Sequence, residues 1–443
     1  MKLTKINLEN FKSHKSSTIH PKKVTILIGP NGGGKSSFLQ SLLILKKTFE
    51  RNESKLRLKD DSYDFGKYID ITRFGKVNEP LSIKIDGIIP MLGLRIPSPV
   101  NAKFEYSFSM ENDIITNLHL LVSIGDFHVY YDRIGHKIYG GVTHRNKEVP
   151  FPIFQISEEF FHPRISLKAL EQMSDEEKSR INSINLLIDD YNEFRNKFNQ
   201  LFADGNFTRN LLMERFFYVP FTRTVSSYSV QFYASADIVH KNPEKTSSAL
   251  LSKISMDSKL RDNVSDLIFS LFGKTIMHRN IPNLENPEKS DVTLDVVKDR
   301  FSTALINEGT GLNQVILLLA TLTNAPENST IGIEEPELHL HPSAQSELAK
   351  IMIRLVSRYS KQVIFTTHSE HMLYPFLASI ASKKEDSLSK DDLAIYYVGM
   401  DEKSQSSNAE PLEVNEYGQI KGGMKGFWDV DLKTLSEFLG EDN

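Results

Sequence analysis

The feature that most constrains the fold is a glycine-rich loop close to the start of the sequence. It reads G-x-x-x-x-G-K-S, and Gly29, Gly34, Lys35 and Ser36 occupy its fixed positions. The β-branched run at 23–29 is typical of a buried strand, and the apolar residues after the loop recur at helical spacing. A loop of this kind between a strand and a helix predicts an α/β fold, with the helix beginning near Lys35.

The glycine-rich loop has the chemistry of a phosphate-binding site. Its glycines allow successive backbone N–H groups to point at phosphate oxygens, and the following helix N-terminus adds partial positive charge. We therefore expect ATP and Mg²⁺ as cofactors, with Lys35 reaching the β and γ phosphates and Ser36 ligating the metal. The expected nucleotide contacts in the loop are Asn31, Gly32, Gly33, Gly34, Lys35, Ser36 and Ser37.

A second feature is the stretch IGIEEPELHLHP at 331–342, in which an apolar strand ends in two adjacent glutamates. Carboxylates this close repel each other, so a cation, or a phosphate chain with its metal, is the expected reason for them. Adjacent residues that leave a strand point in different directions. We assign Glu334 to the magnesium ion and Glu335 to the water molecule that it orients and deprotonates during hydrolysis.

The same acidic stretch allows two other interpretations. An acidic turn that caps the next helix would suit Glu337 better than the glutamate pair, because Pro336 separates the pair from that helix. His339 and His341 could ligate zinc, but no third ligand stands at a recognisable spacing, so a structural role is expected for both.

Two further segments are expected to carry polar groups to the site. The order strand, helix and strand over 329–367 predicts parallel pairing, which delivers His368 to the sheet edge where ligands bind. Upstream, the segment from Asn307 through Gly309 and Thr310 to Gly311 precedes an apolar helix, whose N-terminus can meet a phosphate. The expected catalytic residues are Glu335 and Lys35, and His368 is expected to lie at the same end of the sheet.

The rest of the chain is predicted from its periodicity. Alternation of period two from 80 to 145 predicts an antiparallel meander, and the charged helical pattern at 166–203 predicts a short arm, roughly 45 Å long if 174–203 is one helix. The polar stretch at 401–410 is expected to be a surface loop. The expected division is 1–155 for the N-terminal part of the nucleotide domain, 156–215 for the helical arm, 216–400 for the C-terminal part and 401–443 for a tail.

Composition excludes several classes of function. The 443 residues contain no cysteine, which rules out disulfides, thiolate zinc sites and cysteine nucleophiles. Apolar runs are far shorter than the ~20 residues of a membrane-spanning helix, and no secretory signal is evident, so a cytoplasmic location without membrane partners is expected. A net charge of −4 gives no overall attraction to nucleic acid, although a local basic groove remains open.

The order of phosphate loop, glycine-containing segment, glutamate pair and histidine resembles the ABC-type P-loop ATPase heads of the SMC, RecF and OLD group. It looks most like stand-alone AAA-type ATPases of bacterial anti-phage systems that carry EPELHLHP, such as the ATPase components of Septu or PARIS. The start INLENFKSHKSSTI and the ending GGMKGFWDVD look similar too, so the resemblance covers roughly 1–50 and 300–430. It implies an α/β head with a mixed central sheet, an antiparallel β subdomain and a short helical, coiled-coil-like insertion.

The resemblance also implies roles for individual residues. Lys12 and Ser13 would lie near the nucleotide, His368 would sense the γ-phosphate, and the segment 307–311 would contact the γ-phosphate of the opposite subunit. ATP would then be sandwiched between two heads, which makes a homo-oligomer, at least a dimer, the expected state. Two departures point to slow hydrolysis: Glu334 stands where the group usually has aspartate, and Asn307 stands where serine is common.

Three functions compatible with these motifs compete. The first is a sensor ATPase of an anti-phage system that controls a separate effector, a nuclease or a toxin. The second is a DNA-repair or chromosome-handling head of RecF or SMC type, which would bind DNA. The third, a transporter motor, is weakest because the motifs look like those of the soluble branch. A self-contained OLD-type nuclease is not expected, because about 75 residues follow His368, too few for a Toprim domain.

Overall fold

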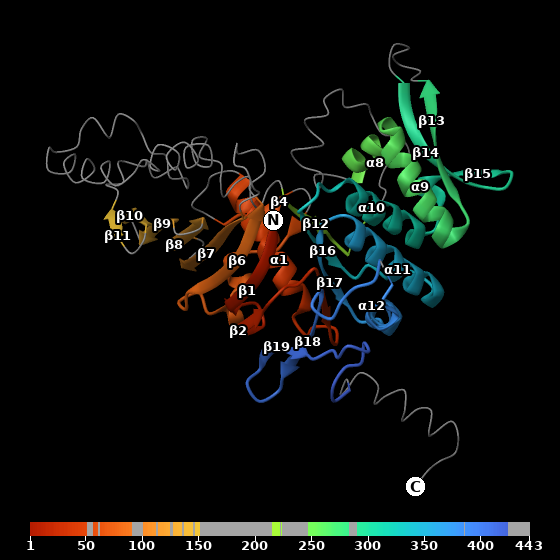
Figure 1. The fold of residues 1–443 in the computed structure, drawn as a ribbon. Coiled ribbons are helices and arrows are strands. Elements are labelled where there is room, and N and C mark those ends of the chain that lie inside the picture. The colour runs from red at the N-terminus through yellow and green to blue at the C-terminus, as the bar shows by residue number, and fades with distance from the viewer. Residues whose placement is uncertain are drawn as a thin grey trace, which may run out of the picture.

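The computed structural model describes residues 1–50, 56–60, 63–90, 101–111, 114–124, 127–134, 137–144, 147–150, 215–221, 223, 247–282, 290–384 and 386–423. Within these ranges two large sheets form separate layers, and helix α1 (Lys35–Glu50) packs between them (Figure 1). The predicted arm at 156–215 lies outside the described residues, apart from its last residue. The described helices include none that is long and apolar enough to cross a membrane.

The central sheet carries the phosphate loop. Its strand order is β12-β16-β17-β3-β18-β19, and every neighbouring pair is parallel except β18 and β19. Every residue of β3, β16 and β17 is buried, as expected where helices and a second sheet cover both faces. The strands are β3 (Val24–Ile28), β12 (Phe216–Val219), β16 (Thr330–Glu334), β17 (Gln362–Thr367), β18 (Leu393–Asp401) and β19 (Ser406–Leu412).

One face of the central sheet is covered by helices (Figure 1). Their apolar sides form a continuous core with the strands, in which the rings of Phe365 on β17 and Phe376 on α12 lie 5.3 Å apart. The helices are α8 (Ser247–Met256), α9 (Ser258–Phe272), α10 (Thr310–Asn324), α11 (Pro342–Arg358) and α12 (Glu370–Ser382).

The other face is covered by α1 and an antiparallel sheet of strand order β11-β10-β9-β8-β7-β6-β1-β2. The helical face predicted after the loop is confirmed, since Phe38, Leu42 and Leu45 are buried against this sheet. The predicted meander is confirmed as well. The strands are β1 (Lys2–Phe11), β2 (His14–Ile19), β6 (Leu81–Pro90), β7 (Asn101–Glu111), β8 (Ile114–Ile124), β9 (Phe127–Ile134), β10 (Lys137–His144) and β11 (Lys147–Pro150).

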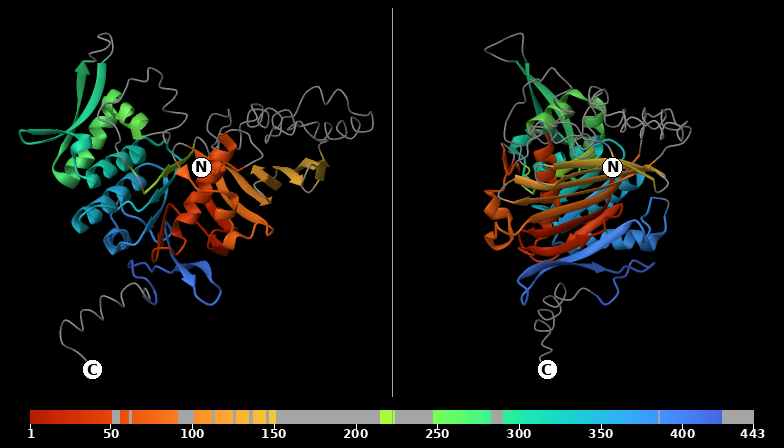
Figure 2. Two further views of the ribbon diagram at one scale, coloured as in Figure 1. Left: turned by 180° about the vertical axis from the view of Figure 1, so that it is seen from behind. Right: turned by 90° about the vertical axis from the view of Figure 1, so that its left-hand side faces the viewer.

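A three-stranded antiparallel sheet projects beyond the helices at the end of the molecule that holds α8 and α9 (Figure 2). It consists of β13 (Thr275–Pro282), β14 (Ser290–Lys298) and β15 (Phe301–Ala304). The short remaining elements are β4 (Lys59–Asp60), β5 (Tyr63–Asp64), α2 (Tyr68–Ile71), η1 (Arg73–Gly75) and η2 (Leu305–Asn307).

The prediction of a surface loop at 401–410 is wrong. Strand β18 continues to Asp401, and β19 begins at Ser406, so only a tight turn at 402–405 separates them. The stretch lacks β-branched residues because β19 is an edge strand, held by its pairing with β18 rather than by an apolar face.

Candidate functional site

The phosphate loop leads from the end of β3 into the first residue of α1, as its sequence predicts. Asn31 and Gly32 are exposed at its tip, whereas Gly33 and Ser37 are buried. Lys35 is also buried, and its Nζ donates hydrogen bonds of 2.8 Å to the carbonyl oxygens of Gly29 and Pro30. Burial lowers the pKa of Lys35, and the attraction of Glu335 and Glu337 opposes that shift.

Two distant segments brace the loop at Gly34. This glycine has φ +95, and a Cβ on it would lie 2.7 Å from His14 Nε2, 2.7 Å from Ser407 Oγ and 2.8 Å from Ser13 Oγ. His14 is fully buried, with Nε2 3.0 Å from the Gly34 carbonyl oxygen. Ser407 Oγ donates to Ser13 Oγ at 2.7 Å. The turn between β1 and β2 and the start of β19 therefore fix the loop from behind, and they bring Ser13 to it.

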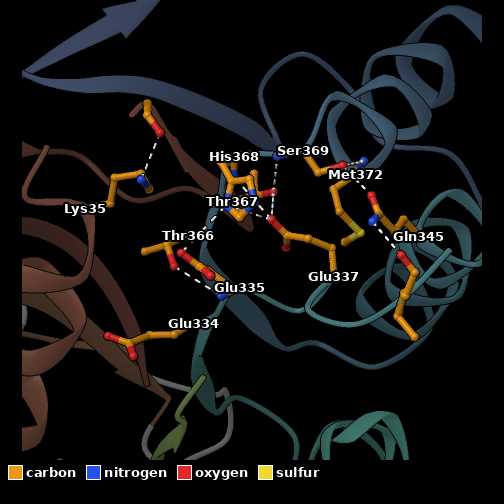
Figure 3. Close-up of polar contacts among 12 residues, drawn as sticks. Lys35, Glu334, Glu335, Glu337, Gln345, Thr366, Thr367, His368, Ser369 and Met372 are labelled. Atoms are coloured by element: carbon orange, nitrogen blue, oxygen red, sulfur yellow. Dashed lines mark hydrogen bonds and ion pairs between the residues drawn. The ribbon is translucent and has the colours of Figure 1, made fainter. Parts of the chain in front are cut away.

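Glu334 lies at the end of β16, facing the first turn of α1 (Figure 3). Its side chain is buried and accepts hydrogen bonds from the side chains of Tyr218, Ser36 and Gln40, the last at 3.0 Å. Burial raises the pKa of Glu334, and these donors oppose the shift. Lys12 completes the group, since its Nζ donates to Gln40 Oε1.

The residues of this group fit a magnesium ion. Ser36 and Glu334 are in hydrogen-bond contact, so a hydroxyl and a carboxylate oxygen already converge on one point. Mg²⁺ usually takes one or two such protein oxygens, together with phosphates and water. Among the described residues no cluster of three or more His, Cys, Asp or Glu could hold a metal by itself. A serine hydroxyl beside one carboxylate is a donor set that suits a metal brought by a nucleotide.

Glu335 and His368 form an ion pair in which Oε1 lies 3.7 Å from Nδ1 (Figure 3). The contact with His368 lowers the pKa of Glu335, and the contact with Glu335 raises the pKa of His368, while burial opposes both shifts. The Glu335 backbone N–H donates to the carbonyl oxygen of Thr366 at 3.1 Å and lies 3.2 Å from its Oγ1. Glu335 is therefore ionised at neutral pH and is held beside the end of β17.

Glu337 has a different role from the helix cap considered above. The cap of α11 is His341, whose Nδ1 accepts from the Ser343 N–H at 3.3 Å. Glu337 is buried, and its Oε1 accepts from Thr367 Oγ1 at 2.5 Å and from the His368 N–H at 3.1 Å. Burial raises the pKa of Glu337. Its carboxyl group thus fixes the segment that carries His368, because that segment and the acidic turn leave neighbouring parallel strands.

The segment 307–311 stands at the N-terminus of an apolar helix, as predicted. Asn307 ends η2, Gly309 is the N-cap of α10 and Thr310 is its first residue. Neighbouring elements hold the segment, since Glu308 pairs with Lys274 at 2.7 Å and a Cβ on Gly311 would lie 2.5 Å from the His339 carbonyl oxygen. Asn307, Gly309 and Thr310 are exposed. Their contact with a γ-phosphate stays a prediction.

Sequence reasoning missed Gln40, Tyr218 and Arg223. Gln40 could have been found, because it stands four residues after Ser36 on the same face of α1. Tyr218 and Arg223 belong to a segment without a motif, and they reach the site only because β12 pairs with β16. A cavity of about 460 Å³ opens beside His368, between the turn 337–340 and the segment 368–371.

A phosphate loop and a carboxylate pair, carried to the same end of a parallel sheet by strands β3 and β16 on either side of β17, define a P-loop ATPase head. The chain belongs to the AAA ATPase domain family, whose family model matches residues 1–373. A search of curated proteins finds no match.

Solved structures of SMC heads are similar to this chain at low identity. An SMC head bound to the C-terminal winged-helix domain of ScpA is 12% identical, with a TM-score of 0.45, and the match covers 94% of this chain and 99% of that one. The Pyrococcus furiosus SMC head with an extended coiled coil, bound to the C-terminal domain of ScpA, is 13% identical, with a TM-score of 0.40 and 99% of both chains covered. The Thermotoga maritima head domain is 14% identical, with a TM-score of 0.39 and coverage of 94% and 100%.

Proposed function

We propose that this protein binds and hydrolyses MgATP, and that the bound nucleotide switches the association of two heads, which controls a separate effector in an anti-phage defence system. One observation carries the hydrolytic part. The phosphate loop, through Lys35 and Ser36, lies against the acidic turn, through Glu334 and Glu335, although the two motifs are about 300 residues apart. This is the arrangement that a triphosphate and its metal require.

In the proposed reaction the loop N–H groups hold the β and γ phosphates, and Lys35 exchanges its bonds to Gly29 and Pro30 for phosphate oxygens. Ser36 and Glu334 would hold Mg²⁺, which when bound would neutralise charge on the phosphate oxygens. Glu335 takes a proton from water as the water oxygen bonds to the γ-phosphorus. The bond from that phosphorus to the bridging oxygen breaks, and ADP and inorganic phosphate are the products. His368, paired with Glu335, would hydrogen-bond the γ-phosphate.

Head association is proposed from the exposed N-terminus of α10. A helix N-terminus offers partial positive charge, and the exposed positions 307, 309 and 310 are free of contacts that would bury them. A second copy that places this segment on the γ-phosphate would complete the charge compensation of the triphosphate. The effector is proposed to be a different chain, because the described residues contain one nucleotide site and no cluster that could hold a second catalytic metal.

The test of hydrolysis is the variant Glu335→Gln, which keeps the shape of the side chain and removes its basicity. We expect ATP binding to persist and turnover to fall by about 10²- to 10⁴-fold, the usual contribution of a general base. Glu347→Gln is the matched control, because Glu347 lies on α11 and pairs with Lys350 away from the site. Unchanged turnover in Glu335→Gln would remove this residue from its role.

The test of the switch is the oligomeric state of Glu335→Gln with and without MgATP, measured by light scattering. A dimer that forms with ATP supports the proposal, and a monomer under both conditions contradicts it. Copurification from the native host then identifies an effector. Hydrolysis stimulated by DNA would instead favour the RecF- or SMC-like alternative.

A further inference from the structure

Arg223 lies directly behind the acidic turn, although no motif surrounds it in the sequence. It follows β12, the edge strand that pairs with β16, and its side chain is only 3% exposed. Burial lowers its pKa to about 10, and the attraction of Glu337, Glu334 and Glu335 opposes that shift. The guanidinium therefore keeps its charge at neutral pH. A buried charge is costly unless hydrogen bonds and opposite charges compensate it, so the contacts of this side chain need an explanation.

The contacts of Arg223 converge on the backbone of the two glutamates. Its Nη1 donates to the carbonyl oxygen of Glu334 at 2.7 Å and to that of Pro220 at 2.8 Å. Its Nη2 donates to the carbonyl oxygen of Glu335 at 3.0 Å. Because the guanidinium is a rigid planar fork, it fixes the two glutamate carbonyls relative to each other.

The backbone of this turn has a conformation that needs support. Glu335 has φ 41, in the left-handed region that residues with a Cβ adopt only when their surroundings hold them there. Thr366 holds the N–H of Glu335 from β17, and Arg223 holds its carbonyl group from the β12 side. The peptide groups on both sides of the Glu335 Cα are thus fixed, and with them the direction of its side chain.

We propose that Arg223 is a positioning residue for ATP hydrolysis: by holding the carbonyl groups of Glu334 and Glu335, it sets where their carboxylates lie relative to the metal and the attacking water. The inference rests on the proposed function. Arg223 acts through the backbone and does not contact the nucleotide, since both of its terminal nitrogens are engaged by carbonyl groups in a buried position.

The experiment compares Arg223→Met and Arg223→Lys with the unaltered protein, at a temperature well below the thermal midpoint of each variant. ATP affinity should stay within about threefold, because the phosphate loop is untouched. We expect kcat to fall by about 10- to 100-fold in Arg223→Met, with a higher Mg²⁺ concentration for half-maximal rate. Arg223→Lys keeps the charge but cannot hold two carbonyl groups in a fixed geometry, so its kcat should be intermediate.

A second readout does not depend on activity. The ring of His368 can be titrated by NMR in the nucleotide-free protein, where its pKa is raised by the contact with Glu335. If Arg223 positions Glu335, the pKa of His368 should fall toward its ordinary value in Arg223→Lys, where the charge near the pair is preserved. This readout tests the positioning role even if the unaltered protein hydrolyses no ATP. Such a lack of hydrolysis would contradict the proposed function but not the contact of Arg223 with the two glutamates.

Arg215→Met is the matched control. Arg215 precedes the same strand and donates to a backbone carbonyl oxygen, that of Glu327, at 2.8 Å, but at the opposite end of the β12–β16 pair. This variant should leave kcat and the pKa of His368 unchanged. The inference is overturned if, in both Arg223 variants, kcat stays within twofold of that of the unaltered protein and the pKa of His368 does not change. It is also overturned if kcat and ATP affinity fall together by the same factor, since that indicates a general loss of the site.

Discussion

The packing behind the phosphate loop predicts that two of its glycines differ sharply in their tolerance of a methyl group. Gly32 and Gly34 both have positive φ, +75 and +95, so alanine is strained at either position. A Cβ at Gly32 meets nothing within 4 Å, whereas a Cβ at Gly34 meets His14, Ser407 and Ser13, each closer than 3 Å. Comparing Gly32→Ala with Gly34→Ala therefore separates backbone strain from collision.

The expected losses in the free energy of unfolding follow from the backbone strain and the collision. Left-handed strain costs alanine about 1–2 kcal/mol, and this is the whole cost expected for Gly32→Ala. The collision at Gly34 adds about 1–3 kcal/mol, because His14 is fully buried and hydrogen-bonded on both ring nitrogens and has no free space to enter. Gly34→Ala should therefore lower the free energy of unfolding by about 2–5 kcal/mol.

Urea unfolding followed by circular dichroism measures both free energies. A second comparison uses Ser407→Gly, which removes one of the three atoms that the new methyl group meets. In that background Gly34→Ala should cost less by about 0.5 kcal/mol or more, the size of coupling expected for side chains in contact. Equal destabilisation by Gly32→Ala and Gly34→Ala would refute the reasoning, because it would mean that Ser13, His14 and Ser407 do not restrict the space around Gly34.

Three further predictions follow from the site and its surroundings. Ser36→Ala should leave ATP binding without metal nearly unchanged and raise the Mg²⁺ concentration for half-maximal hydrolysis by about tenfold, as titration of the rate with Mg²⁺ would reveal. Lys361 is buried with a pKa of about 8, against an ordinary 10.5. The unfolded chain therefore binds more protons between these values, and the free energy of unfolding should rise with pH there by up to about 3 kcal/mol, an increase that Lys361→Met should lack. In the pair of Glu335 and His368 the carboxyl pKa is lowered and the imidazole pKa is raised. The pair should therefore contribute fully to the free energy of unfolding between the ordinary pKa values of 4.5 and 6.5. This contribution should be lost as pH rises through the folded pKa of His368 or falls through the folded pKa of Glu335. Urea unfolding of Glu335→Gln at several pH values checks this, and a difference from the unaltered protein that does not vary with pH would contradict it.

The parts of the fold that could be predicted from sequence are those whose signals are local. The loop 29–36 with its flanking strand and helix is one such part, and the strand, helix and strand over 329–367 is another. In both, apolar residues with a clear period border a motif of fixed spacing. Strands β2 and β19 were missed because their sequences, HKSSTI and SSNAEPL, are mostly polar, and long-range pairing decides their conformation.

The contacts of the site also divide into those that could be predicted from sequence and those that could not. The juxtaposition of Lys35 with the glutamate pair could be predicted, because parallel strands carry their C-terminal ends to one edge. The role of Glu337 could not, since its partners Thr367 and His368 come from the next strand. The role of Arg223 could not be predicted either, because its side chain donates to a carbonyl group 111 residues further along the chain. Such contacts leave no spacing in the sequence that a motif could capture.

Strand β3 has a consequence for how the protein is made. Both of its neighbours in the sheet, β17 and β18, are encoded more than 300 residues later, beginning at 362 and 393. At ~5–20 residues per second, a ribosome needs on the order of tens of seconds to supply them. During that interval an apolar strand and an unformed loop must stay out of aggregates. A nascent chain released before 362 carries the entire G-x-x-x-x-G-K-S motif but neither of the strands that flank β3.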